Sequence, residues 1–164
     1  MNLREFYDVG MNFEMFVGTG SRSERDRIPK NYSRISIASE DIEKIKSFGA
    51  IKFLIVGEIW CFDVQLNSSV VRKFCEINHN FDMRVITKGR GEKFLKPMLE
   101  LEELKIPLIL ILNEDGELLG KFQERPQTVK AHGDFQEIKV DYFKGAYLND
   151  TVRELIELLE KSEI

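Results

Sequence analysis

The pattern of hydrophobic and polar positions in the middle of the chain predicts two buried strands joined by a helix. Residues 50–60 form a short apolar run bounded by glycines, as in a strand that is covered on both faces. Residues 81–87 form a second apolar run of strand type. Between the two runs, apolar side chains recur at helical spacing, so residues 63–78 are predicted to form a helix with one apolar face.

The hydrophobic period changes again in the second half of the chain. Residues 91–104 predict a further helix, in which Pro97 lies early or introduces a kink. Residues 106–126 contain two apolar segments that flank an Asn-Glu-Asp-Gly turn. Because Asp-Gly between apolar runs is a strong hairpin signal, this segment is predicted to form two antiparallel strands.

The end of the chain predicts an amphipathic helix after a connection of uncertain structure. Residues 149–162 place their apolar side chains on one face, and Asn149 or Asp150 is available as the N-cap. The preceding polar connection has no clear period, and within it residues 138–143 are interpreted as a candidate strand.

The first part of the chain predicts helices without a strand. In residues 2–16 apolar side chains recur at intervals of three and four residues, which indicates a helix interrupted at Gly10. Residues 18–34 are rich in charge, Gly and Ser, and are expected to form a loop or a short exposed helix before Pro29. Residues 39–49 predict a clearer helix.

This order of helices and strands predicts an α/β fold. A strand, helix and strand followed by a hairpin and a closing helix requires a mixed sheet with helices on both faces. With 164 residues, 43% of them hydrophobic and 32% charged, the chain is the size of one ordinary globular domain. We therefore expect residues 1–164 to form a single domain.

Composition and charge exclude several classes of function. The net charge is -4 and the basic residues are dispersed, so nucleic acid is not expected as a partner. The longest apolar run, residues 106–112, is far shorter than the roughly 18 residues of a membrane span. Residues 1–13 carry acids among their apolar positions and do not resemble a secretory signal. We expect a soluble protein of the cytoplasm.

Only two cysteines occur, and Cys61 has the more informative position. It lies between a predicted strand and a predicted helix, where free backbone N–H groups stabilise a thiolate. Asp63, two residues later, opposes a second negative charge, so the sequence leaves the direction of the net pKa shift open. The alternative interpretation is that Cys61 is a small apolar packing residue.

The second cysteine, Cys75, is expected to belong to the core because it shares the apolar face of its helix. It lies 14 residues beyond Cys61, about 20 Å along one helix, whereas bridged cysteines need Cα atoms within about 7 Å. Cys75 and His79 are one turn apart, but the only other histidine is His132 in a loop, so no metal site is predicted. The glycine pairs at 18–20 and 89–91 lack the lysine of a phosphate loop, and no cofactor is predicted.

Three short motifs carry a resemblance to a known family. The chain has "WCFDV" at 60–64, "IP" at 106–107 opening the predicted hairpin, and "ERP" at 124–126. This arrangement resembles the thioredoxin superfamily, and most closely a bacterial thioredoxin-like family with the signature "WCGDC". The resemblance implies a thioredoxin-like fold with residues 1–38 as an N-terminal helical extension packed on the domain. It also implies a cis peptide bond before Pro107, which would face the cysteine and help to hold extended peptide substrates.

The departures from the family pattern affect the chemistry directly. Val64 stands where the family has its second, resolving cysteine, and valine cannot attack a mixed disulfide. Ser69 stands where the family usually has a proline, and Ile55 where thioredoxin has a buried aspartate that transfers protons. Glu58 and Asp63 remain as candidates for that proton transfer.

Two functions follow from this pattern. The first is monothiol exchange, in which Cys61 forms a mixed disulfide with a protein or a low-molecular-weight thiol and an external thiol resolves it. The second is a redox-inactive binding module that uses the groove beside Pro107. In both, the residues expected to contact the substrate are Trp60, Phe62, Asp63, Ile106 and Pro107.

Overall fold

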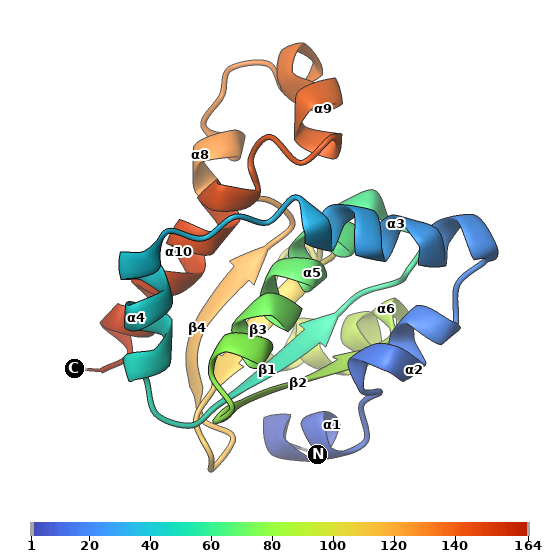
Figure 1. The fold of residues 1–164 in the computed structure, drawn as a ribbon. Helices are drawn as coiled ribbons and strands as arrows, with labels where there is room; N and C mark the ends of the chain where they lie inside the picture. Colours follow the sequence, from blue (N-terminus) through green and yellow to red (C-terminus); the bar gives the residue numbers. More distant parts are fainter. Residues whose placement is uncertain (1, 164) are drawn as a thin grey trace.

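A computed structural model describes residues 2–163 of the protein. Four strands form one sheet in the order β2-β1-β3-β4 (Figure 1). β1 is parallel to β2, whereas β3 is antiparallel to both of its neighbours. The strands are β1 (Ile51–Val56), β2 (Phe81–Ile86), β3 (Leu108–Leu112) and β4 (Leu118–Gln123). The predicted mixed sheet and the hairpin are therefore confirmed.

Burial explains why the two central strands read as continuous apolar runs. Every residue of β3 is buried, as is every residue of β1 except Lys52, because these strands have neighbours on both sides and helices on both faces. In their antiparallel register Val56 is opposite Leu108. β4 lies at the edge of the sheet and is mostly exposed or half-buried.

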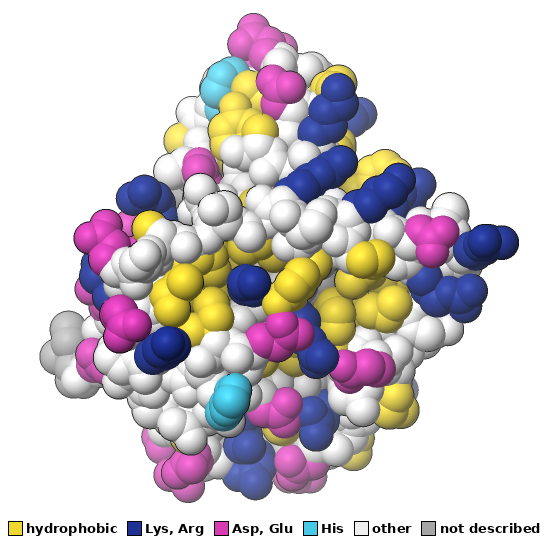
Figure 2. Space-filling model, viewed as in Figure 1, with side chains coloured by type: hydrophobic (Ala, Val, Ile, Leu, Met, Phe, Trp, Pro, Cys, Tyr) yellow, Lys and Arg dark blue, Asp and Glu magenta, His cyan; other side chains and the backbone are white. Residues whose placement is uncertain are grey.

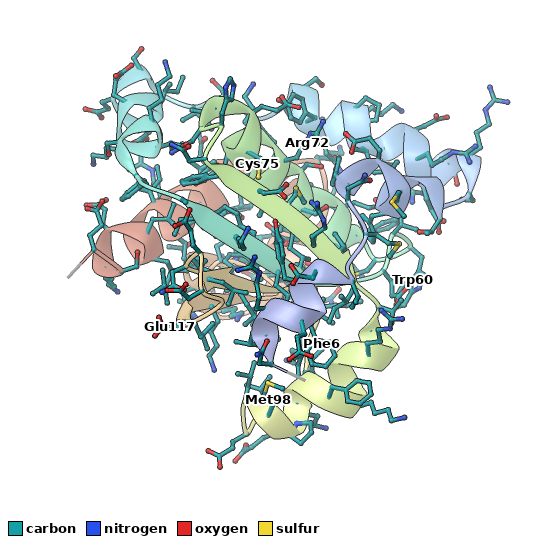
Figure 3. The ribbon with its side chains drawn as sticks, turned by 90° about the horizontal axis from the view of Figure 1, so that it is seen from below. Phe6, Trp60, Arg72, Cys75, Met98 and Glu117 are labelled. Atoms are coloured by element: carbon teal, nitrogen blue, oxygen red, sulfur yellow. The ribbon has the colours of Figure 1, made fainter. Side chains whose placement is uncertain are left out.

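Helices cover both faces of the sheet, as Figures 1 and 3 show from two directions. On one face α5 (Phe62–Ile77) packs against β2, and α10 (Leu148–Lys161) packs against β4 and α5. On the other face three short consecutive helices lie behind the sheet: α6 (Lys88–Arg90), the π-helix η1 (Gly91–Leu95) and α7 (Lys96–Met98). No helix in residues 2–163 is long and apolar enough to cross a membrane.

The predicted interruption of the first helix occurs at Gly10. Here α1 (Leu3–Asp8) ends and α2 (Phe13–Gly18) has not begun, and Met11 forms an antiparallel bridge with Val85 of β2. A Cβ atom on Gly10 would lie 2.8 Å from Cβ of Arg84. The glycine therefore permits the close approach of this segment to the sheet edge.

The segment 18–34 differs from its prediction. It forms α3 (Arg22–Ser33), a helix of 12 residues that includes Pro29 instead of ending before it. A capping box between Ser21 and Glu24 starts this helix. Ile28 is buried and α3 packs along α5, so tertiary contact outweighs the backbone hydrogen bond lost at the proline. The next helix is α4 (Ser39–Ser47), close to its prediction.

The prediction of a strand at residues 138–143 is wrong. The connection after β4 contains two helices, α8 (Gln127–Lys130) and α9 (Phe135–Phe143). Ile138 and Tyr142 are the buried residues of α9, and their spacing of four places them on one helical face.

Two helix boundaries also differ from their predictions. The helix expected over 91–104 already ends at Met98, and Glu100 follows with a φ of 54°. α10 begins at Leu148, so Asn149 and Asp150 lie inside it, and no side-chain oxygen caps it.

Candidate functional site

The candidate site lies where β1 ends and β3 begins. Because Val56 pairs with Leu108, the segment after β1 and the segment before β3 lie at the same end of these two central strands. Cys61 is the N-cap residue of α5, and its side chain caps no backbone N–H group. The Ile106–Pro107 peptide bond is cis. The fold thus brings together residues separated by more than forty positions in the sequence.

The site residues differ strongly in exposure. Trp60 is 55% exposed, Phe62 is 44% exposed, and Cys61 is half-buried. Trp60 lies at the rim of the molecule in Figure 3. Ile106 and Pro107 are both buried. The two aromatic rings therefore supply most of the apolar surface that a partner can reach beside the thiol.

The surroundings of Cys61 raise the pKa of its thiol. Burial is the largest cause, and the nearby carboxylates of Asp63 and Glu124 act in the same direction. The backbone N–H groups of Val64 and Asp63 lower the pKa without overcoming burial. The structure thus answers the question that the sequence left open, because burial and the two carboxylates outweigh the backbone N–H groups at the helix N-terminus.

Asp63 is held by Arg125, the central residue of the "ERP" motif, whose role the sequence did not indicate. Its carboxylate is buried and accepts two hydrogen bonds from Arg125, at 2.9 and 3.2 Å. The Arg125 guanidinium also lies 3.7 Å from the centroid of the Phe135 ring. The pair connects the first turn of α5 to the segment after β4.

Glu58, the other candidate for proton transfer, is also engaged. Its Oε2 atom accepts a hydrogen bond of 2.7 Å from the backbone N–H of Lys88, at the start of α6. Both carboxylates near the motif thus already have partners of their own. The site offers no free acid in place of the missing aspartate among the candidates named from the sequence.

A buried polar network lies beneath the motif, centred on Asn67. Its Nδ2 donates to the carbonyl oxygens of Asp63 and Glu124, at 2.9 and 3.0 Å, and contacts the Tyr142 hydroxyl at 3.1 Å. Its Oδ1 accepts from Thr151 at 2.7 Å. This single amide therefore joins α5 to the end of β4, α9 and α10. The sequence signal for it was the group of four polar residues within five positions of this helix, Gln65, Asn67, Ser68 and Ser69.

The position of the missing resolving cysteine is part of the core. Val64 has no exposed surface, and a Cβ atom on Gly57 would lie only 2.9 Å from Val64 Cγ1. Ser69, in the place of the family proline, donates to the carbonyl of Gln65 at 2.7 Å. α5 continues unbroken through this position. Ile55 is fully buried, so the place of the buried aspartate is apolar.

Both cysteines are free thiols, in agreement with the distance argument from the sequence. Cys75 packs against the core near the far end of α5. Burial raises the pKa of its thiol to about 12. It therefore serves as a packing residue.

The fold and the site define a class of protein. A parallel β1-α5-β2 unit with a cysteine at the start of its helix, followed by an antiparallel hairpin that opens with a cis-proline, is the arrangement of thioredoxin-fold proteins. The sequence matches the family model described as "Thioredoxin" over residues 10–139. The chain belongs to this thioredoxin family.

Two solved structures are similar over almost the whole chain. One is the crystal structure of PA1234, a protein of unknown function from Pseudomonas aeruginosa, with 30% sequence identity and a TM-score of 0.92. The other is an HIV epitope scaffold, with 30% identity and a TM-score of 0.91. Each match covers 98% of both chains. A comparison with curated protein sequences found no significant match.

Proposed function

We propose that this protein is a thioredoxin-fold binding module that holds a partner polypeptide beside Cys61 and Pro107 without catalysing disulfide turnover. The observation that carries the proposal is the buried Val64, one helical turn after Cys61, which is packed against Gly57. A dithiol cycle requires a second thiol at this position to release the substrate. In this protein the buried side chain of Val64 occupies that position instead.

The electrostatics of the site support the same conclusion. The pKa of Cys61 is raised by burial and by two carboxylates, so the thiol is protonated at neutral pH. Glu58 accepts a hydrogen bond from the Lys88 backbone N–H, and Asp63 accepts one from Arg125, so both carboxylates have partners of their own. The raised pKa leaves little thiolate at neutral pH and so lowers the rate of thiol attack.

We expect the partner to bind beside the cysteine in an extended conformation, as the resemblance to thioredoxins implies. Trp60 offers an exposed ring just after the end of β1. Aromatic rings contribute much of the binding free energy in protein interfaces. We place the protein in the cytoplasm, with residues 1–38 as an extension of one domain. Packing of α1 and α2 on β2, and of α3 on α5, supports that domain organisation.

Partner capture by matched variants tests the proposal. The Cys61→Ser variant is expected to retain the same partner as the wild type, because the contact does not depend on sulfur. Trp60→Ala is expected to lose it, whereas Trp60→Phe retains most of it. If Cys61→Ser loses the partner and a thiol reductant releases it from the wild type, the binding-module proposal is wrong.

Monothiol exchange is the second candidate, because Cys61 is free and half-exposed at the start of α5. The Cys61 thiolate would attack a disulfide of the partner, form a mixed disulfide and release one partner thiolate. An external low-molecular-weight thiolate would then attack the partner sulfur and release Cys61 as thiolate. Alkylation of Cys61 against pH separates the candidates. An apparent pKa below the free-thiol value of about 8.5 supports exchange, and a higher one supports the binding module.

A further inference from the structure

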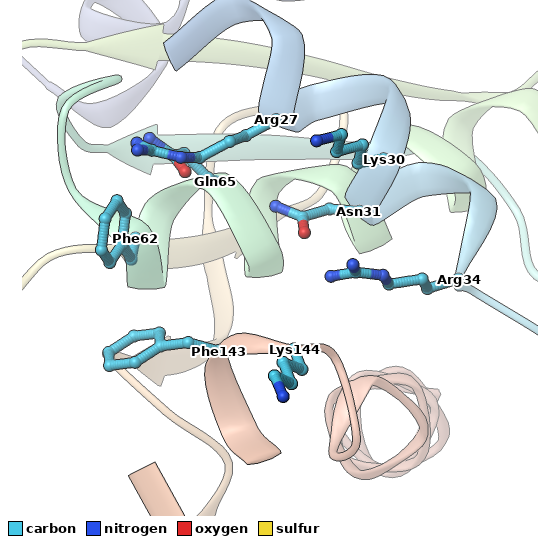
Figure 4. Close-up of a pocket in the computed structure, with 8 residues that line it drawn as sticks. All are labelled: Arg27, Lys30, Asn31, Arg34, Phe62, Gln65, Phe143 and Lys144. Carbon is cyan, nitrogen blue, oxygen red and sulfur yellow. The ribbon is translucent and has the colours of Figure 1, made fainter. Parts of the chain in front are cut away.

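A cationic cavity lies beside the candidate site, between α3, the start of α5 and the end of α9 (Figure 4). It has a volume of about 230 Å³. Four basic side chains line it: Arg27, Lys30, Arg34 and Lys144. The lining contains no acidic side chain. On the molecular surface, Lys and Arg side chains gather over the gap between α3 and α9 (Figure 2).

The four basic groups of this cationic cavity are not neutralised by the protein. Within residues 2–163, none of them lies within 4.0 Å of a carboxylate oxygen. Like charges that converge on one hollow repel one another and raise the local potential. The whole chain has a net charge of -4, so the positive potential here is local and opposite to that of the molecule.

One contact and one close approach place basic groups at the cavity. The Arg27 guanidinium lies 4.4 Å from the centroid of the Phe62 ring. Arg34 passes close to Gly145, where a Cβ atom would lie 3.1 Å from Arg34 Cδ. Gly145 also has a φ of 93°, a conformation that favours glycine. The chain therefore brings Arg34 next to Lys144 although the two residues are more than one hundred positions apart.

Asn31 supplies a neutral polar group to the wall of the cavity. It is only 6% exposed, and Figure 4 shows its amide between α3 and α5, facing the cavity. Its amide makes none of the side-chain hydrogen bonds of the described residues, whereas the neighbouring Gln65 donates to Ile59 O at 2.7 Å. The amide of Asn31 therefore has hydrogen-bonding capacity that a ligand in the cavity can use.

The size and walls of the cavity limit the ligand to a compact molecule. Its volume is below the range of roughly 300 to 1,000 Å³ that is usual for drug-sized ligands. The rings of Phe62 and Phe143 meet edge to face with centroids 5.5 Å apart. This arrangement leaves no slot for a planar base between the rings.

We propose that the cationic cavity binds a compact small molecule that carries two negative charges, such as a phosphate monoester or a short dicarboxylate. The basic side chains neutralise its charges, and the amide of Asn31 donates a hydrogen bond to it. This site depends on none of the chemistry of Cys61 and goes beyond the proposed function.

Titration of the full chain, observed by amide NMR at constant ionic strength, tests the proposal. The probes are inorganic phosphate, glycerol 3-phosphate and succinate, with acetate as the singly charged control. We expect saturable shifts of the Asn31 side-chain amide and of the Phe62 backbone amide with at least one dianion. The probe with the lowest dissociation constant shows whether the site binds a phosphate or a dicarboxylate. Equal, non-saturating responses to all four probes would overturn the proposal.

Matched charge variants locate the binding. Arg34 is exposed, so Arg34→Gln preserves the fold and is expected to raise the dissociation constant about tenfold. Lys139 lies on the exposed side of α9 outside the cavity, so Lys139→Gln removes the same charge and is expected to have less than a twofold effect. If both variants weaken binding equally, the attraction is to the surface in general and the cavity is not a site.

Discussion

Replacing Val64 by cysteine tests whether the missing resolving thiol is the only reason for the loss of dithiol chemistry. Val64 lies three residues after Cys61, one turn along α5, and it is fully buried. The thiol of the Val64→Cys variant would take the place of one valine methyl group. We expect this variant to form a disulfide with Cys61 and to gain insulin-reducing activity that the wild type lacks.

The structure sets the expected effect on stability. The substitution removes one buried methyl group, which costs about 1 kcal/mol and lowers the Tm of the reduced variant by about 2 to 4 °C. Oxidation closes a loop of four residues, which stabilises the protein by about 2 kcal/mol in the chain-entropy model. The oxidised variant should therefore melt about 4 to 8 °C above the reduced one.

The assay compares insulin reduction in the presence of dithiothreitol with thermal melts of both redox forms. Val64→Ala controls for the loss of packing without adding sulfur, and Val64→Cys combined with Cys61→Ser controls for a single thiol at the new position. No gain of activity in a variant that forms the disulfide would refute the reasoning. Wild-type activity equal to that of an ordinary thioredoxin would refute it as well.

Three further predictions concern the groups around the motif. Asp63→Asn removes a carboxylate that raises the pKa of Cys61, so the thiol should react faster with iodoacetamide at about pH 7, and an unchanged rate would contradict this. Arg125→Met leaves the Asp63 carboxylate buried without its partner and should lower the free energy of unfolding, measured in urea, by about 3 kcal/mol. A loss below about 1 kcal/mol would contradict this, because it is the size expected for an exposed ion pair. Cys75, whose pKa is raised to about 12, should stay unmodified at about pH 8.5 in native protein and react once urea unfolds it.

The elements that the sequence predicted well depend on local patterns. The apolar runs of β1 and β3, the Asp-Gly turn and the amphipathic face of α10 each follow from residues close together in the chain. The predictions failed where distant contacts decide the conformation. α3 continues through Pro29 because it packs on α5, and α9 is a helix because Ile138 and Tyr142 are buried together.

The same division holds for the candidate site. The sequence alone determined the position of Cys61 between a strand and a helix, the absence of a thiol at Val64 and the resemblance to thioredoxins. Only the tertiary structure decided the direction of the Cys61 pKa shift, because burial and the approach of Glu124 from the end of β4 outweigh the backbone N–H groups.

The pairings across long stretches of chain were likewise decided by the tertiary structure. Asp63 meets Arg125, and Asn67 meets Thr151, across 62 and 84 positions. The cationic cavity brings residues of α3 and of the end of α9 to one hollow. Charge and hydrogen-bonding effects depend on distance and burial in space, and a linear pattern of residue types does not contain these quantities.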